Sequence, residues 1–346
     1  MTTMMTPPPP SSPPSTTPPS LEPPKLPRPI RRKRRLMQLG ALALVIGSLI
    51  LDVGGIFLIP LVFVLVVPFE RMFPRHDQPI RRAHLGLDMT YAIAGPLLTL
   101  LGGIAIAAVA ILTFAWLPGL AFRPLVAAMP PLVQIIVGFL LFDFLIYWAH
   151  RFSHEVPFLW RFHSVHHSVE TMDWISGFRN HPIDGAILAP PIAFLLAAGF
   201  SPEATGVFAV LQVITGLFLH ANVRWRLRPL QRIIITPEFH HWHHTNEEQA
   251  INTNYSVFLP AWDIIFGTWF MPKDRRPQVY GIDEPIPTGL LPQLFFPFRG
   301  LRSPLWMMRH PIKGFRYTLG LMRRGTKQLW RSARRPARKA VSAVDA

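Results

Sequence analysis

The chain has 346 residues, half of them hydrophobic and 16% charged, and its mean hydropathy of +0.27 is too high for an ordinary soluble protein. It contains no cysteine, which excludes disulfides, iron–sulfur clusters, thiolate zinc sites and thiol nucleophiles, so a metal site must use histidine, carboxylate or amide ligands. The formal net charge is +16. In so apolar a chain, basic residues more often mark cytoplasmic loops and contacts with anionic lipid, and we expect no nucleic-acid partner.

Residues 1–35 are predicted to form a disordered, proline-rich basic tail. Twelve prolines lie within residues 1–30, among serine and threonine, and such a segment cannot bury enough apolar surface to fold. The run Arg31 to Arg35 follows, immediately before the first apolar block. A nuclear signal is the competing interpretation, but this position favours an anchor to lipid headgroups.

Four apolar blocks follow, each with at most one charge, and their length is typical of bilayer segments: 36–68, 91–117, 132–149 and 186–219. The first is interrupted by Asp52, Gly54 and Gly55, and is either one tilted span or a shallow hairpin. The last has a turn signal at Ser201–Pro202–Glu203, which favours a hairpin. The middle two are predicted to be single spans joined by a loop, 118–131.

The basic residues predict which side of the membrane each loop faces. Seven lie in 1–35, four in 69–90, one in 118–131, three in 150–185 and thirteen in 299–346. If both doubtful blocks are hairpins, the basic-rich loops and all the clustered histidines share one face, which we expect to be cytosolic. We therefore predict an integral, multi-pass protein, of a bacterial inner membrane rather than the endoplasmic reticulum. Residues 299–346 fit a basic amphipathic tail.

Histidines cluster in the windows 150–167 and 240–244, which hold nine of the fourteen. His150 and His154 are four residues apart, and the triplets His163–His166–His167 and His240–His243–His244 share the spacing 0, +3, +4. On a helix these positions share one face, so each box can direct two or three imidazoles at one point. His76, His84 and His310 stand alone and are expected to be ordinary hydrogen-bonded residues.

Eight imidazoles packed together repel one another when protonated and are costly to desolvate when neutral, unless a metal accepts their lone pairs. A zinc ion takes three or four protein ligands, so eight imidazoles suggest two metal ions. The spacing does not choose among Zn, Cu, Fe and Ni. The boxes begin where an apolar block ends, within reach of a lipid chain. An alkyl chain offers little to polarise or hydrolyse, so an oxidant generated from O2 by a redox metal is the natural hypothesis.

The residues resemble the membrane fatty acid hydroxylase and sterol desaturase superfamily of di-iron oxygenases. The resemblance covers about 80–285 and depends on the ordered segments Asp143–Phe–Leu–Ile–Tyr–Trp–Ala–His150–Arg–Phe–Ser–His154, His163–Ser–Val–His166–His167 and His240–His–Trp–His243–His244. Arg179–Asn–His181–Pro182, His220–Ala–Asn222, Trp262–Asp263 and Phe266–Gly267–Thr268 are further likenesses.

The resemblance implies an all-α fold: an integral membrane helical bundle of about four spans or hairpins, within domain 36–298, capped by a cytosolic, histidine-rich helical domain that holds the metals. It implies that two Fe ions are bound by His150, His154, His163, His166, His167, His240, His243 and His244, with O2 as co-substrate. His220 resembles an additional ligand, with a helix-ending residue as the alternative. His181 lies near the site and is a weaker candidate ligand, and His241 occupies a variable position and is expected not to bind.

Asp143 is two helical turns before His150. As a charge within a span, it either orients an imidazole by accepting its second N–H or is hydrogen-bonded within the bundle.

The expected reaction is O2-dependent hydroxylation or desaturation of an unactivated C–H region of a lipid, such as a fatty acyl chain or a sterol. The chain shows no dinucleotide fingerprint or haem domain, so electrons must come from an external ferredoxin-like or cytochrome-type donor with its reductase. The alternatives are a membrane haem-b electron carrier, which predicts histidines midway along apolar helices, and a metal-binding or transport protein, which predicts a polar path through the spans.

Overall fold

The structure, a computed structural model, describes residues 58–301 except 113, 115 and 186–188, together with residues 32, 36, 39, 40, 43, 306, 309–313, 316, 317 and 320. The chain divides into two units, Met1–Leu36 and Met37–Ala346, and every element named below belongs to the second. The predictions for most of the two tails and for residues 44–57 of the first apolar block therefore lie outside the described residues.

All regular elements in the described part of the chain are helical, as predicted, and two isolated β-bridges join Pro74 to Val223 and Thr245 to Tyr280. The α-helices are α2 (Leu58–Met72), α3 (Leu85–Leu101), α4 (Gly103–Leu112), α5 (Trp116–Ala127), α6 (Pro131–Glu155), α7 (Pro157–His167), α8 (Ala189–Ala197), α9 (Pro202–Leu219), α10 (Pro237–His243), α11 (Ala261–Phe266) and α12 (Leu290–Phe295). Short 3₁₀ turns are η1 (Trp174–Phe178), η3 (Arg228–Leu230), η4 (Glu248–Ala250) and η5 (Phe296–Phe298).

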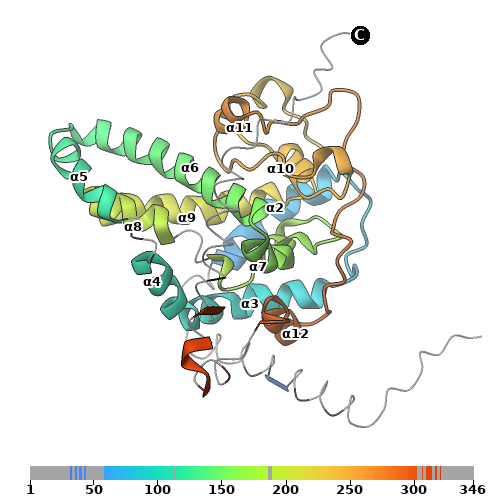
Figure 1. The fold of residues 1–346 in the computed structure, drawn as a ribbon. Coiled ribbons are helices and arrows are strands. Elements are labelled where there is room, and N and C mark those ends of the chain that lie inside the picture. The colour runs from blue at the N-terminus through green and yellow to red at the C-terminus, as the bar shows by residue number, and fades with distance from the viewer. Residues whose placement is uncertain are drawn as a thin grey trace, which may run out of the picture. The chain divides into compact units, whose positions relative to one another are not determined.

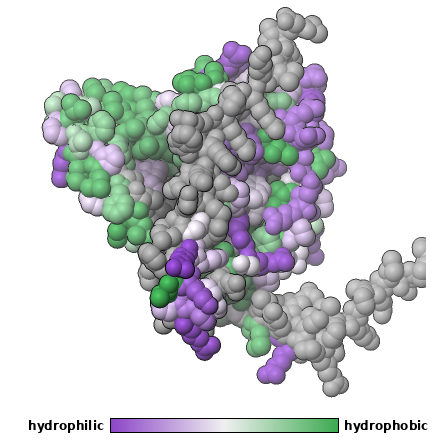
Figure 2. Space-filling model, in the orientation of Figure 1, coloured by the Kyte–Doolittle hydropathy of each residue, from purple (hydrophilic) through white to green (hydrophobic). Residues whose placement is uncertain are grey.

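Helices α5, α6, α8 and α9 form an apolar helix group in which α5 and α6 pack on α8, and α6 packs on α9 (Figure 1). Its core contains Phe142, Leu195 and Phe208. Figure 2 shows hydrophobic side chains gathered over these helices. Exposed apolar residues there include Leu117, Leu120, Phe122, Leu125, Leu132, Ile135, Ile136, Val207, Val210 and Val213. So large an exposed apolar surface is typical of contact with a membrane.

Two helices of the apolar helix group are long and apolar enough to cross a bilayer. Helix α6 has 25 residues with a mean hydropathy of 2.1, and α9 has 18 residues with a mean hydropathy of 1.5. At 1.5 Å per residue they measure about 37 and 27 Å, close to the ~30 Å thickness of a hydrocarbon core. The prediction of an apolar helix over 132–149 is therefore confirmed, and α6 extends to Glu155, beyond the first histidine box.

The segment 91–117, predicted to be a single span, does not form one continuous helix. The chain forms α3 and α4, which are separated at Gly102. Gly102 and Gly103 are poor helix formers because they lose much backbone freedom in a helix, and neither resulting helix reaches 18 residues. The predicted loop 118–131 is also mostly helical and forms α5. Within the described residues, two helices qualify as candidate spans, compared with the prediction of about four spans or hairpins.

The block 186–219 forms two contacting helices, α8 and α9, as the hairpin prediction requires. The turn lies slightly earlier than predicted, because Gly199 adopts a φ of +92° and Ser201 is the N-cap of α9, with its Oγ accepting from Ala204 N at 3.0 Å. Helices α6 and α9 both end at the histidine-rich region, so the apolar helix group delivers His150, His154 and His220 to the same place.

Candidate metal centre

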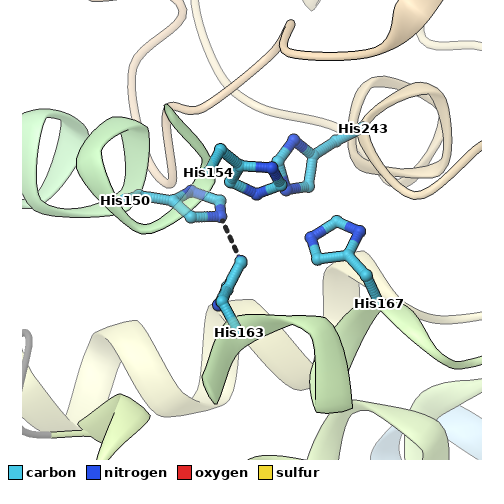
Figure 3. Close-up of side chains that lie close together, drawn as sticks. All are labelled: His150, His154, His163, His167 and His243. Carbon is cyan, nitrogen blue, oxygen red and sulfur yellow. Dashed lines mark hydrogen bonds between the residues drawn. The ribbon is translucent and has the colours of Figure 1, made fainter. Parts of the chain in front are cut away.

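One group of five imidazoles combines all three boxes (Figure 3). His150 and His154 come from α6, His163 and His167 from α7, and His243 from α10, and one ring nitrogen from each lies within 4.8 Å of those of the others. Helix α6 ends at Glu155 because Pro157 disfavours a helical conformation at Val156, whose φ and ψ are −101° and 111°. This extended residue redirects the chain, so that α7 faces the last turns of α6.

A second group of four imidazoles lies beside the first. It consists of His166 on α7, His220 at the C-cap of α9, His240 on α10 and His244 at the C-cap of α10, again with ring nitrogens within 4.8 Å of one another. The two groups are in contact, since the rings of His167 and His244 stack with their centroids 4.2 Å apart. The groups together contain the nine histidines predicted as ligands, and the 0, +3, +4 boxes each contribute to both.

Acceptors behind the imidazoles fix which nitrogen faces inward. The Nδ1 atoms of His150, His243, His166 and His220 lie 2.6, 2.9, 3.2 and 2.7 Å from backbone carbonyl oxygens of Tyr255, Thr253, Arg179 and Gly216. Nδ1 of His163 lies 2.8 Å from the carboxylate of Asp184. Carbonyl and carboxylate oxygens only accept, so each Nδ1 carries the proton and donates it. Each Nε2 then presents its lone pair to the interior, as a metal ligand requires.

The ring nitrogens that face the interior of these groups have the properties expected of metal ligands. The buried Nε2 atoms of His154, His167, His220 and His243 have no hydrogen-bond partner. Nε2 of His150 lies 3.2 Å from Nε2 of His163, and with both Nδ1 atoms protonated these are two facing lone pairs. Unpartnered buried nitrogens are costly to maintain, and a bound cation satisfies them.

Six of the imidazoles outside the candidate spans have a lowered pKa, which favours the neutral form that a metal ligand requires. Burial, reinforced by neighbouring imidazoles, lowers the pKa of His166, His167, His240, His243 and His244 well below 6.5. Burial also lowers the pKa of His220 to about 4. A neutral imidazole offers its lone pair without a proton having to leave first.

One loop, 253–256, supplies two of the carbonyl acceptors. It is held by Asp263, whose buried carboxylate accepts from Tyr255 N and Ser256 N at 2.8 Å each and from Thr268 Oγ1 at 2.6 Å. Asn254, in a left-handed conformation with a φ of +59°, donates from Nδ2 to Phe239 O on α10. Asp263 and Thr268, which lie in two of the segments that carry the resemblance, thus help to position His150 and His243.

Asp143 does not orient an imidazole. Its carboxylate accepts from Phe258 N, Leu259 N and Trp262 Nε1, at 3.3, 3.2 and 2.9 Å. These bonds attach α6 to the segment that begins α11. The alternative of an aspartate hydrogen-bonded within the bundle is therefore the one that fits, because all three of its donors come from a neighbouring segment rather than from a histidine.

His181 and His241 lie outside both imidazole groups. Nε2 of His181 lies 3.0 Å from Leu294 O, and its Nδ1 accepts from Ile183 N, so both of its nitrogens are occupied and direct coordination is not supported. The ring of His241 has other partners, with Nδ1 at 3.0 Å from Arg75 Nη1 and 3.2 Å from Tyr280 Oη. This placement agrees with the expectation that His241 does not bind a metal ion.

Asp184 is the residue of the site that the sequence analysis missed. It is buried, 8% exposed, and contacts His163 through the Nδ1 bond described above. It lies three residues after His181 in a stretch without helical periodicity. The only signal in the sequence was its closeness to the Arg179–Asn–His181–Pro182 segment.

We predict that Asp184→Asn lowers metal affinity or activity by about 10- to 100-fold, the usual effect of removing the hydrogen-bond partner of a ligating imidazole. Asparagine can accept from His163 but carries no charge to increase its basicity. Titration of the metal-free protein with Fe²⁺ measures this effect. The matched variant is Asp274→Asn, because Asp274 is an exposed carboxylate outside the site, and it should leave iron affinity unchanged. Equal affinities in the two variants would contradict a positioning role for Asp184.

Comparisons with known proteins agree with this geometry. The model of the fatty acid hydroxylase family matches residues 135–268, which include every histidine of both groups. The ornithine lipid hydroxylase OlsE of Rhizobium tropici is 37% identical over 49% of this chain and 51% of its own length. The human alkylglycerol monooxygenase is 33% identical over 44% of this chain and 33% of its own. The sphingolipid C4-hydroxylase sur2 of Schizosaccharomyces pombe is 29% identical over 46% and 54%.

The chain thus spans about half or less of the length of these relatives, all of which are lipid hydroxylases or monooxygenases. No solved structure matches. Residues 135–268 thus match the fatty acid hydroxylase family, and over about half of its length the chain is similar to these lipid hydroxylases and monooxygenases.

Proposed function

We propose that this protein is a membrane-bound di-iron oxygenase that uses O2 to hydroxylate or desaturate an unactivated C–H region of a lipid. The observation that carries the proposal is the pair of imidazole groups, five and four residues, with buried nitrogens that lack partners. Nine nitrogen ligands suit two redox metal ions, and hydroxylase and monooxygenase relatives favour iron over zinc.

In the proposed enzyme, His150, His154, His163, His167 and His243 hold one iron, and His166, His220, His240 and His244 hold the other. Bound iron supplies the activation of O2 that an unactivated C–H bond requires. The protein fixes five of the nine imidazoles through the acceptors behind them. It also limits access of bulk water, since seven of the nine histidines are buried and His150 and His154 are half-buried. The histidines that would bind the metal ions come from α6 and α7 and from the ends of α9 and α10.

A lipid substrate is supported by the position of the site at the ends of α6 and α9, whose outer surfaces are apolar. We propose a multi-pass protein of a bacterial inner membrane with both imidazole groups at the cytosolic face. Ornithine lipid is the first candidate substrate, because the Rhizobium tropici relative is an ornithine lipid hydroxylase. Fatty acyl, sterol, sphingolipid and ether-lipid substrates are the alternatives.

Lipid profiling under ¹⁸O2 tests the reaction. Cells that express the protein are compared with cells that express the His166→Ala variant, in a host that lacks the activity. Hydroxylation adds one ¹⁸O atom to a lipid in the first culture alone, whereas desaturation removes two hydrogens and adds no label. Identical lipid profiles in the two cultures, with iron-loaded protein in the membrane, would contradict the proposed function.

The external electron donor is proposed to dock on a basic patch formed by Arg224, Arg226, Arg228, Lys273, Arg275 and Arg276. The two segments adjoin, because Arg276 Nη2 donates to Arg224 O at 2.8 Å and Arg228 Nη2 to Lys273 O at 2.9 Å. Arg275 lies over the ring of Trp242, 5.2 Å from its centroid, and Trp242 immediately precedes His243 on α10. The patch is therefore close to the imidazole groups, and it suits an acidic protein.

We predict that Arg224→Ser/Arg228→Ser slows turnover supported by a ferredoxin and its reductase by about tenfold at low salt, since charge complementarity mainly raises association rates. Turnover driven by dithionite should be unchanged, and high salt should remove the difference. Arg81→Ser/Lys313→Ser removes the same charge elsewhere and serves as the control. Equal slowing with dithionite, or a loss of membrane binding, would contradict docking of a donor at this patch.

A further inference from the structure

A cavity of about 360 Å³ opens from the first imidazole group to the surface. Its inner wall includes the rings of His154, His167 and His243, two of which, His167 and His243, are more than nine-tenths buried with unpartnered Nε2 atoms. Trp160, Ile251 and Ile282 add apolar surface to its lining. A molecule in this cavity would therefore have one end beside the proposed iron site.

The rim of the cavity is acidic. Asp283 and Glu284 line it with the amides of Asn246 and Asn252, and no lysine or arginine is among its lining residues. Oδ1 of Asp283 accepts from Asn246 Nδ2 at 2.6 Å, which fixes that carboxylate at the rim. This is unusual in a chain with a net charge of +16. The rim offers hydrogen-bond acceptors and negative charge, which suit a cation that donates hydrogen bonds.

The rim is attached to the helix that carries the ligands. Asn246 N donates to Val279 O at 3.0 Å, Thr245 Oγ1 donates to the same oxygen at 2.7 Å, and Thr245 and Tyr280 form a β-bridge. Gly281 then turns the chain with a φ of +97°, in contact range of Glu170, so that residues 282–284 reach the cavity. Because Thr245 follows His244 directly, these contacts connect the rim of the cavity to the imidazole groups.

The size of the cavity limits what it can hold. At about 360 Å³ it lies near the lower end of ligand pockets, which measure about 300–1,000 Å³. A headgroup and a few carbons fit such a cavity, and the rest of a long-chain lipid would lie outside it. Bound metal ions repel a cation at the inner end, whereas the carboxylates attract it at the rim. A cationic headgroup would therefore place its ammonium at Asp283 and Glu284 and uncharged carbons beside the imidazoles.

We infer that this cavity binds the headgroup of an amphiphilic substrate that carries a primary ammonium group, so that the reacting C–H bond lies in or next to the headgroup. The inference rests on the proposed function for the reaction, but the binding site itself does not depend on turnover. It narrows the open substrate classes to lipids with an amine-bearing headgroup, and it assigns Asp283 and Glu284 to substrate specificity.

Binding of two matched probes to the full-length, iron-loaded protein in a neutral detergent tests the inference. N-dodecanoyl-1,4-diaminobutane carries one ammonium group, and its N′-acetyl derivative is neutral. Isothermal titration calorimetry should show about fivefold tighter binding of the charged probe at low salt, as expected for two partly exposed ion pairs. The preference should fall toward unity in Asp283→Asn/Glu284→Gln and at high salt, and persist in Glu248→Gln/Asp274→Asn, a control pair of exposed carboxylates outside the cavity.

Equal affinity of the wild-type protein for the two probes, or an unchanged preference in the rim variant, would overturn the inference. A lower iron content in the rim variant would also overturn it, by assigning the carboxylates to metal uptake. Butylamine that binds as tightly as the acylated probe would assign the site to soluble amines. Selective binding by a protein that oxidises no lipid would contradict the proposed reaction and leave the headgroup site in place, so the two failures are distinguishable.

Discussion

The His243→Ala variant is expected to lose turnover entirely and to retain less iron, while still inserting in the membrane. His243 contributes to the first imidazole group from α10, and its ring centroid lies 4.5 to 4.7 Å from those of His150, His154 and His167. Its replacement removes one donor from the group and leaves Thr253 O without its partner. Iron content of the purified variant and lipid oxidation in cells measure the two effects.

His241→Ala is the matched control, on the same helix and two residues away. Its ring contacts Arg75 and Tyr280 rather than either imidazole group. The variant should keep its iron, although loss of a fully buried side chain lowers its thermal stability. Iron retained by His243→Ala and lost by His241→Ala would show that the ligands on α10 have been assigned to the wrong face.

The second large effect is expected from Asp88→Asn, which should lower the free energy of unfolding by about 3–5 kcal/mol. Asp88 on α3 is fully buried and pairs with Arg179 at 2.6 Å and with Arg82 at 2.8 Å, both of which are also buried. Removing its charge leaves two buried guanidinium groups incompletely paired, although Arg82 retains Asp173. Arg179 also provides the carbonyl behind His166, so the second imidazole group should lose order as well.

Denaturant titration in detergent, with tryptophan fluorescence as the signal, measures the loss of stability. Asp77→Asn is the control, because Asp77 is exposed and surface substitutions usually change stability by no more than about 0.5 kcal/mol. If Asp88→Asn unfolds at the same denaturant concentration as this control, the buried ion-pair network does not stabilise the fold in the way described.

The ligand-bearing helices were predictable from sequence because helical periodicity alone places residues at 0, +3 and +4 on one side. His220 was predictable only through the resemblance, since a single histidine at the end of an apolar block has the same pattern as an ordinary helix cap. Its approach to His166, with ring centroids 4.9 Å apart, depends on the packing of α9 against the rest of the domain. The division of each box between two groups also depends on that packing.

The acceptors behind the imidazoles could not be predicted. Four of the five are backbone carbonyls, which every residue has, and they are selected by loop conformation alone. Asp184 and Asp143 show the same limit. Both are acidic residues near histidines in the sequence, but only the fold determines that Asp184 contacts an imidazole and that Asp143 contacts Trp262.

The expectation of one continuous helix was wrong for the segment in which hydropathy was the only signal. The segment 91–117 is uniformly apolar, but Gly102 and Gly103 allow two short helices in place of one long one. The prediction succeeded for 132–149, which has no such break apart from Gly138. There Phe200 and Phe208 pack within 3.4 Å of the position a Cβ would occupy, so the glycine permits close helix packing rather than a turn.

Metal analysis of the full-length protein, purified from membranes in a neutral detergent after growth with iron and zinc both supplied, tests the central claim most directly. The arrangement of nine imidazoles in two adjoining groups predicts two iron ions per chain, and loss of iron in the His243→Ala and His166→Ala variants. Stoichiometric zinc, or protein that is folded and lipid-active with no iron bound, would contradict it.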